Sequence, residues 1–118
     1  MKIEDHINRE ELAERLDHDM NLYRELVELF LNDSVKLLER INEAIINNDA
    51  QGLQKAAHTL KGSVSNFSAF RAREIALQLE YLGRDKNLNE SSRIFQILDD
   101  EITNVKEAMR FLSTQESL

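Results

Sequence analysis

The residues best suited to chemistry lie in one short stretch, 57–63, which contains His58, Lys61 and Gly62. Apolar residues recur around this stretch at helical spacing and form a single stripe: Leu53, Ala56, Ala57, Leu60, Val64 and Phe67. At about 100° per residue, His58 points about 150° away from the mean direction of the stripe, so its imidazole faces solvent or the helix edge. An unperturbed histidine is mostly neutral at pH 7, and its free ring lone pair can act as a nucleophile.

Two neighbours of His58 indicate which reaction its imidazole could carry out. Lys61 stands on the flank of the helix and adds a positive charge within reach of a group carried on the ring. Gly62 lies in line with His58, although a glycine inside a helix costs about 1 kcal/mol relative to alanine. The pattern therefore suggests clearance for a partner's backbone and acceptance of a phosphoryl group. From spacing alone, an ordinary surface histidine beside a tolerated glycine remains the simpler alternative.

The sequence around His58 also resembles a known signature. Residues 58–63, His-Thr-Leu-Lys-Gly-Ser, follow Ala57 and precede Asn-Phe-Ser-Ala at 66–69. This stretch is similar to the pattern H-x-L-K-G-S of histidine-containing phosphotransfer (HPt) domains, in which a small-residue break leads into the next helix. Agreement is weaker at 82–84, and the family often has glycine where this chain has Ser68.

The resemblance implies a function in two-component phosphorelays. His58 would accept a phosphoryl group from the aspartate of one receiver domain and pass it to the aspartate of another. The expected partners are receiver domains of response regulators or hybrid sensor kinases. Because the receiver would supply Mg²⁺, the chain itself is expected to need no cofactor. The sequence has no Gly-rich phosphate loop, so we expect a phosphocarrier without an ATP site, either alone or as a domain of a hybrid histidine kinase.

Four further residues are candidates for the site. Glu80 lies on the next helix, and it reaches the height of His58 if the chain turns midway between them. By the resemblance, a carboxylate at this offset could hold Nδ1–H and leave Nε2 as the nucleophile, while an ordinary surface glutamate is the equal alternative. Gln54 could act similarly, although solvation is favoured. Gln54, Lys55 and Ser65 could also belong to the surface on which a receiver docks.

The composition favours a single all-α domain spanning residues 1–118. The chain is 42% apolar, has no proline and contains three glycines. Its net charge of −7 makes nucleic acid a poor partner. The charged start is unlike a signal peptide and no apolar run approaches the ~20 residues of a membrane span, so a cytoplasmic location is expected. The absence of cysteine excludes disulfides and thiolate metal sites.

Apolar spacing and capping residues predict one short helix and four long ones. Asn8, Asp19 and Asp49 have the form of helix N-caps. The expected helices cover 8–17, 20–47, 49–67, 69–84 and 91–112. Residues 1–7 are expected to be a flexible lead-in and 113–118 a frayed tail. These elements indicate an antiparallel up-down-up-down four-helix bundle, with the short first helix covering one end as an accessory.

The sequence also predicts where chain breaks and core residues lie. Ser68 or a neighbour is expected to break the helix that carries His58, and Gly83 or Asn87 to end the following one. The longest helix is expected to face the core with one broad apolar stripe: Met20, Tyr23, Leu26, Val27, Phe30, Leu31, Val35, Leu38, Ile41 and Ile45.

Two alternatives belong to other functional classes. The near-heptad spacing of 94–112 would also suit a purely structural bundle that serves as an adaptor or oligomerisation module. A metal-binding bundle would need paired Glu-x-x-His motifs, which this sequence lacks. His6 and His18 lie beside acidic residues, but they are too close together to converge without a turn, so we expect no metal site.

Overall fold

Helices account for all the regular structure of residues 2–118, the part of the chain that this computed structural model describes, and no strand occurs among them. In chain order they are the 3₁₀ helix η1 (Ile3–Asp5) and the α-helices α1 (Arg9–Arg15), α2 (Met20–Ile46), α3 (Ala50–Ser65), α4 (Phe70–Arg84) and α5 (Ser91–Ser113). The predicted helices are therefore present, with ends that differ by a few residues.

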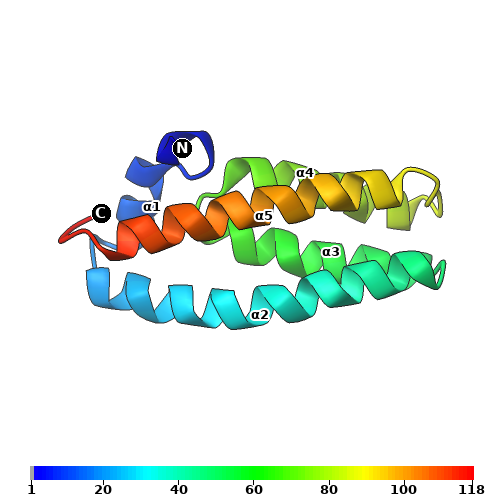
Figure 1. Ribbon diagram of the computed structural model, residues 1–118, viewed down its shortest axis with the longest axis horizontal. Coiled ribbons are helices and arrows are strands. Elements are labelled where there is room, and N and C mark those ends of the chain that lie inside the picture. The colour runs from blue at the N-terminus through cyan, green and yellow to red at the C-terminus, as the bar shows by residue number, and fades with distance from the viewer. Residues whose placement is uncertain (1) are drawn as a thin grey trace.

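The four long helices run alongside one another in a bundle of 45 × 23 × 19 Å (Figure 1). Consecutive long helices pack on one another, and the ring closes because α5 also packs against α2. Short connections force consecutive helices to run in opposite directions. The predicted antiparallel up-down-up-down four-helix bundle is thus confirmed.

The predicted N-caps fix where three of the helices begin. The side chains of Asn8, Asp19 and Asp49 each accept a hydrogen bond from the backbone N–H three residues further on, at 2.9–3.0 Å. Each bond satisfies one of the N–H groups that a helix start leaves without an intrahelical partner. The cap at Asp49 matters for function, because it sets the start of α3, the helix that carries His58.

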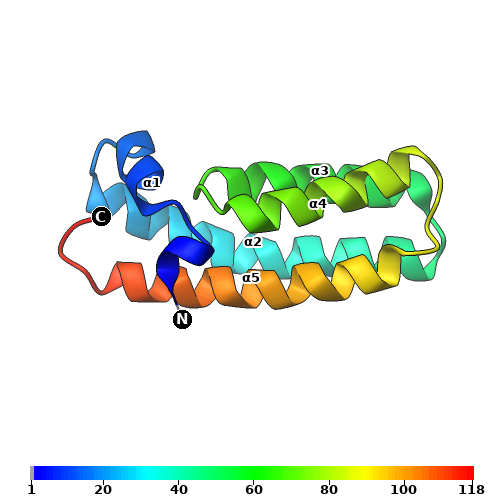
Figure 2. The same cartoon turned by 90° about the horizontal axis from the view of Figure 1, so that it is seen from above.

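The accessory helix covers a step left by helices of unequal length. Helices α2 and α5 have 27 and 23 residues, whereas α3 and α4 have 16 and 15. At 1.5 Å per residue, the longer pair extends beyond the shorter pair at one end. In Figure 2, α1 lies at the protruding end of α2, and the preceding helix η1 lies over α5. Leu12 and Leu16 of this segment are buried there, as predicted for an accessory helix.

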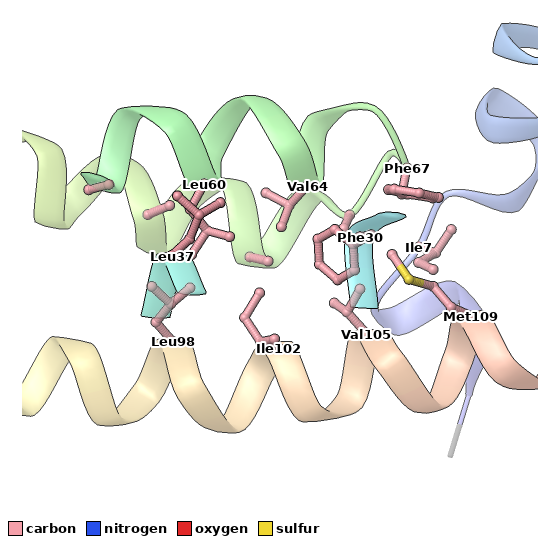
Figure 3. Packing of buried hydrophobic residues seen from close by; sticks show 14 of the residues in the cluster. Ile7, Phe30, Leu37, Leu60, Val64, Phe67, Leu98, Ile102, Val105 and Met109 are labelled. Atoms are coloured by element: carbon pink, nitrogen blue, oxygen red, sulfur yellow. The ribbon is translucent and has the colours of Figure 1, made fainter. Parts of the chain in front are cut away.

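Side chains from all four long helices meet in a continuous apolar core (Figure 3). The predicted stripe of α2 is wrong at Val35, which is 48% exposed, while Ser34 and Leu37 are buried instead. From Phe30 onward the buried positions of α2 follow alternating steps of four and three residues, which is the spacing that keeps a long helix against its neighbours. Val35 lies five residues after Phe30 and therefore does not fall on this series of buried positions.

The turn between α3 and α4 lies at Ser68, where the predicted break is confirmed. Ser68 has φ 53°, in the left-handed region where glycine is usually preferred. Two contacts with α1 and its N-cap residue hold Ser68 in this conformation. The backbone N–H of Asn8 donates to the Ser68 carbonyl at 3.0 Å, and the Ser68 hydroxyl donates to Glu11 Oε1 at 2.8 Å. A serine thus replaces the glycine frequent in the resembled family by adding a side-chain bond that glycine could not make.

The segment before α1 packs on the bundle, which corrects the expectation of a loose lead-in. Ile7 is completely buried, and the ring of His6 contacts Glu101 of α5 with 2.8 Å between Nδ1 and Oε2. The histidine that was weighed as a metal ligand is thus used in a buried polar pair. Met1 lies outside the described residues. The last residue of the chain also contacts this region, because Nε of Arg9 donates a hydrogen bond to the carbonyl of Leu118 at 2.8 Å.

Helix α4 ends at Arg84, as predicted, but neither Gly83 nor Asn87 supplies the left-handed residue at its end. Gly83 lies inside the helix rather than after it, and the left-handed residue that follows the helix is Lys86, with φ 55°. Gly83 is needed for packing instead. A Cβ at this position would lie 2.6 Å from the backbone nitrogen of Gln54 and 2.7 Å from the carbonyl oxygen of Ala50, both in α3. The glycine therefore allows α3 and α4 to approach closely beside His58.

Candidate functional site

The side chain of His58 stands on the outer face of α3, as the stripe analysis predicted, and is 66% exposed. Its Nδ1 lies 3.1 Å from Oε2 of Glu80, which comes from the antiparallel helix α4. The turn at Ser68 lies midway between the two residues, so they reach the same height along the bundle. Nδ1 of His58 thus contacts the Glu80 carboxylate, while the exposed ring projects from α3.

Lys61 shares the same carboxylate. Its Nζ lies 2.7 Å from Oε1 of Glu80, the oxygen that His58 does not contact. Both side chains are largely covered, with 18% of Lys61 and 15% of Glu80 exposed. The sequence suggested a lysine free to reach a group on the ring, whereas the structure pairs its ammonium with Glu80. Glu80 thus bridges an imidazole and an ammonium.

The charge state of Glu80 determines which nitrogen of His58 carries the proton. Partial burial alone would raise the pKa of Glu80, but hydrogen bonds from Lys61 and His58, together with their charges, outweigh it and hold the pKa below its usual value. The carboxyl group is therefore ionised at neutral pH and can only accept hydrogen bonds. Nδ1 of His58 must then be the donor, which leaves the lone pair of a neutral ring on Nε2.

The surface beyond the ring is bare at Gly62, one turn along α3. A Cβ built at this glycine would meet no other atom within 4 Å, leaving aside the backbone of its own helix. Packing within the chain therefore does not require glycine here, in contrast to Gly83. The open space agrees with the interpretation that Gly62 provides clearance for another molecule.

The three remaining candidates are not all equally close to the ring. Gln54 and Lys55 line a shallow hollow on the surface together with His58 and Glu80. Ser65 lies nearly two turns away in the other direction, toward α1. Its hydroxyl donates to the carbonyl of Lys61 at 2.6 Å and is thereby used within its own helix. The structure thus brings Gln54 and Lys55 to the site and places Ser65 at its margin.

Sequence reasoning missed the pairing of Lys61 with Glu80, although a signal for it existed. Side chains in an α-helix lean toward the helix N-terminus. Lys61 therefore leans back toward the height of His58, and Glu80, on a helix running the opposite way, leans toward Lys61. Applying this rule to both helices would have predicted that the two side chains converge.

Two features that other functional classes would need do not occur in the described part of the chain. Within residues 2–118, no helix is both long and apolar enough to cross a membrane. The same residues hold no group of three or more histidine, cysteine, aspartate or glutamate side chains placed to bind a metal ion. The contacts described above define the candidate site as the cluster of His58, Lys61 and Glu80 with the bare surface at Gly62.

Comparison with known proteins places the chain in a family. The family model of the Hpt domain matches residues 25–108, which include α3, α4 and the whole candidate site. The chain therefore belongs to the Hpt domain family, whose members are phosphorelay carriers that interact with receiver domains and have no catalytic site of their own. The alternative of a purely structural bundle is not favoured.

Solved structures agree with this assignment. The crystal structure of histidine-containing phosphotransfer protein B (HptB) from Pseudomonas aeruginosa PAO1 is similar with a TM-score of 0.86 and 25% identity, over 92% of this chain and 94% of that one. The HPT domain of a sensor hybrid histidine kinase from Shewanella shares the fold, with a TM-score of 0.78 and 20% identity over 93% of this chain and 96% of that domain. Among curated protein sequences, none matches.

Proposed function

We propose that Nε2 of His58 accepts a phosphoryl group from the aspartyl phosphate of one receiver domain and passes it to the aspartate of a second. The observation that carries the proposal is the geometry of the ring. His58 is exposed, and the contact of its Nδ1 with the Glu80 carboxylate leaves Nε2 with a free lone pair. A nucleophile held in one tautomer and orientation by a neighbouring carboxylate is a recurring arrangement in catalysis by histidine.

The transfer requires little covalent machinery from the chain. The lone pair of Nε2 forms the nitrogen–phosphorus bond in line, while the bond to the aspartyl oxygen breaks and its electrons return to the carboxylate. The second receiver reverses these events with its own aspartate. Such reactions depend on positioning and on neutralising the phosphoryl oxygens, for which we expect Mg²⁺ held by the receiver. The chain itself would bind no cofactor and would not react with ATP.

The docking surface proposed for the receiver surrounds the ring. Gln54 and Lys55 border His58 on one side, and Gly62 leaves bare helix on the other, with Ser65 beyond it. Both a separate phosphotransfer protein and a domain of a hybrid kinase occur among the similar structures, and the surface suits a receiver in either context. The net charge of −7 argues against nucleic acid as a partner.

Gly62→Gln tests whether the bare surface serves docking. The new side chain has open space around it and improves helix propensity by somewhat less than about 1 kcal/mol, so we expect unchanged or slightly higher stability. Because it would stand between His58 and the receiver, transfer should slow by about tenfold or more. Rapid-quench transfer assays and urea denaturation measure the two effects. An unchanged transfer rate would show that the glycine is incidental.

The proposal itself is tested with a panel of phosphorylated receiver domains incubated with the wild-type chain. We expect label on the chain that is lost in acid and retained in alkali, as a phosphoramidate bond requires, and that then moves to a second receiver. A parallel incubation with ATP should leave the chain unlabelled. Acid-stable label, or label acquired from ATP without a receiver, would contradict the proposal.

A further inference from the structure

We propose that Lys55, and not Lys61, is the cation of this chain that contacts the phosphoryl oxygens while the group moves to and from His58. This inference rests on the proposed function and deepens it, because it assigns the positive charge that the chain itself contributes to the transfer. Its basis is the hollow that Lys55 lines together with His58, and the ion pair that holds Lys61 elsewhere.

Lys61 is close to the ring in sequence, but its contacts do not suit this role. Its Nζ lies 2.7 Å from Oε1 of Glu80, and both side chains are largely covered. Lys61 is also not among the residues that line the hollow beside the ring. Moving its ammonium to a phosphoryl group would leave a largely covered carboxylate without its ion-pair partner, which costs free energy. Lys61 therefore stabilises the position of Glu80.

The ring of His58 directs its accepting nitrogen toward the side of α3 on which Lys55 stands. Side chains on a helix lean toward its N-terminus, so the ring stands over the turn that contains Lys55. The two nitrogens of an imidazole point in nearly opposite directions, and Nδ1 is directed to Glu80 on α4. Nε2 is therefore directed away from α4, across the outer face of α3. The hollow beside the ring includes Lys55 and Thr59 of that face.

Lys55 is available to a group carried on Nε2. Its side chain is exposed, and within residues 2–118 it takes part in no ion pair. The other polar groups of α3 in the hollow are less suitable. The Thr59 hydroxyl already donates to the carbonyl of Lys55 at 3.1 Å, and Gln51 and Gln54 carry no charge. A lysine has three donors on a flexible stem, so its ammonium can follow phosphoryl oxygens as they move.

The acidic residues on the other side of Lys55 do not hold its ammonium. Lys55 also borders a second hollow, between α2 and α3, which contains Asp49 and Glu43. Asp49 is used as the cap of α3, where its carboxylate accepts from the backbone N–H of Gly52. Glu43 lines that hollow together with Arg40, whose positive charge offsets its own. The ammonium is therefore not committed to α2.

The role of Lys55 in the transfer is electrostatic. The lone pair of Nε2 forms the bond to phosphorus while the bond to the aspartyl oxygen breaks and its electrons return to the carboxylate. During this step negative charge is spread over the three remaining phosphoryl oxygens. The ammonium of Lys55 donates hydrogen bonds to these oxygens and keeps its proton. It makes the same contact when the group leaves His58 for the second receiver.

Three variants separate this role from a general effect of charge. Lys55→Gln removes the ammonium from the site, and Lys55→Arg retains a positive charge there. Lys106→Gln is the matched control, because it removes the same charge from α5, which packs on α2 and α4 rather than on α3. Circular dichroism would establish that all the proteins are folded.

The experiment measures phosphorylation of His58 by two donors. One is phosphoramidate, a small donor that requires no docking, and the other is a phosphorylated receiver domain over a range of concentrations. We expect Lys55→Gln to slow labelling by phosphoramidate, and transfer at saturating receiver, by about tenfold, as for loss of one solvent-screened charge contact. Lys55→Arg should stay within about threefold of wild type, because the charge is kept. Lys106→Gln should react as wild type does.

Failure of this inference is distinguishable from failure of the proposed function. If neither donor labels His58 in the wild-type chain, the acceptor assignment is wrong and the inference falls with it. If phosphoramidate labels wild type and Lys55→Gln at the same rate, the inference alone is overturned. A higher receiver concentration for half-maximal transfer, with an unchanged rate at saturation, would also overturn it, since Lys55 would then serve docking only. Equal slowing by Lys106→Gln would reduce the effect to net charge and overturn it as well.

Discussion

His58→Gln is expected to take up no phosphoryl group from any receiver domain, while its stability stays within about 0.5 kcal/mol of wild type. Glutamine is of similar polarity, and its amide can donate to Glu80 in place of Nδ1–H, so the surface around α4 should be preserved. A side chain that is 66% exposed contributes little to the core. What glutamine lacks is a nucleophilic ring nitrogen, and an amide cannot replace it.

His18→Gln provides the matched control. His18 is also exposed, but it lies in the turn between α1 and α2 with φ 58°, away from Lys61 and Glu80. If the acceptor is defined by its surroundings rather than by exposure alone, this variant should be labelled as wild type is. Quantitative transfer assays with one receiver donor compare the three proteins. Substantial label on His58→Gln would move the acceptor to another residue and overturn the assignment.

The fold was predictable because its determinants are local in the sequence. Asn8, Asp19 and Asp49 cap helices by accepting from amides three residues away, and such bonds depend on no distant residue. The prediction failed where distant segments decide. Ile7 is buried because α1 must cover the step above α2 and α5, and helix lengths reveal that step only after the bundle is assembled. The apolar stripe predicts that Val35 faces the core, but it is exposed because a broad stripe contains more residues than a bundle can bury.

The candidate site was likewise predictable where its determinants are local in the sequence, and not where distant side chains decide. The outward direction of His58 follows from the stripe of its own helix, and the height of Glu80 follows from one antiparallel turn. Which oxygen of Glu80 contacts which partner depends on side-chain direction in two helices at once, and that information is not carried by spacing. The two glycines illustrate the limit most clearly. The sequence predicts Gly62 inside one helix and Gly83 as a possible end of the next, yet both lie inside helices, where one borders open space and the other borders backbone.

Gly83→Ala should therefore destabilise the protein although alanine is the better helix former. The added methyl group would lie 2.6 to 2.7 Å from backbone atoms of Gln54 and Ala50, which cannot rotate away as a side chain can. Overpacking of this kind costs about 1–3 kcal/mol and more where backbone must move, against a gain of about 1 kcal/mol in helix propensity. We expect a net loss of about 2 kcal/mol in the free energy of unfolding, measured by urea denaturation.

The same substitution at the other glycine is the control that isolates packing from propensity. Gly62→Ala meets no atom within 4 Å, so it should raise the free energy of unfolding by up to about 1 kcal/mol. Gly83→Ala should in addition slow transfer through His58, because Glu80 lies less than one turn away on α4 and moves with it. At low temperature both variants are folded. If α4 is displaced, transfer through His58 in Gly83→Ala should remain slow there. Equal stabilisation by the two alanines would contradict the close approach of α3 and α4, and with it the argument that Gly83 positions the carboxylate beside the ring.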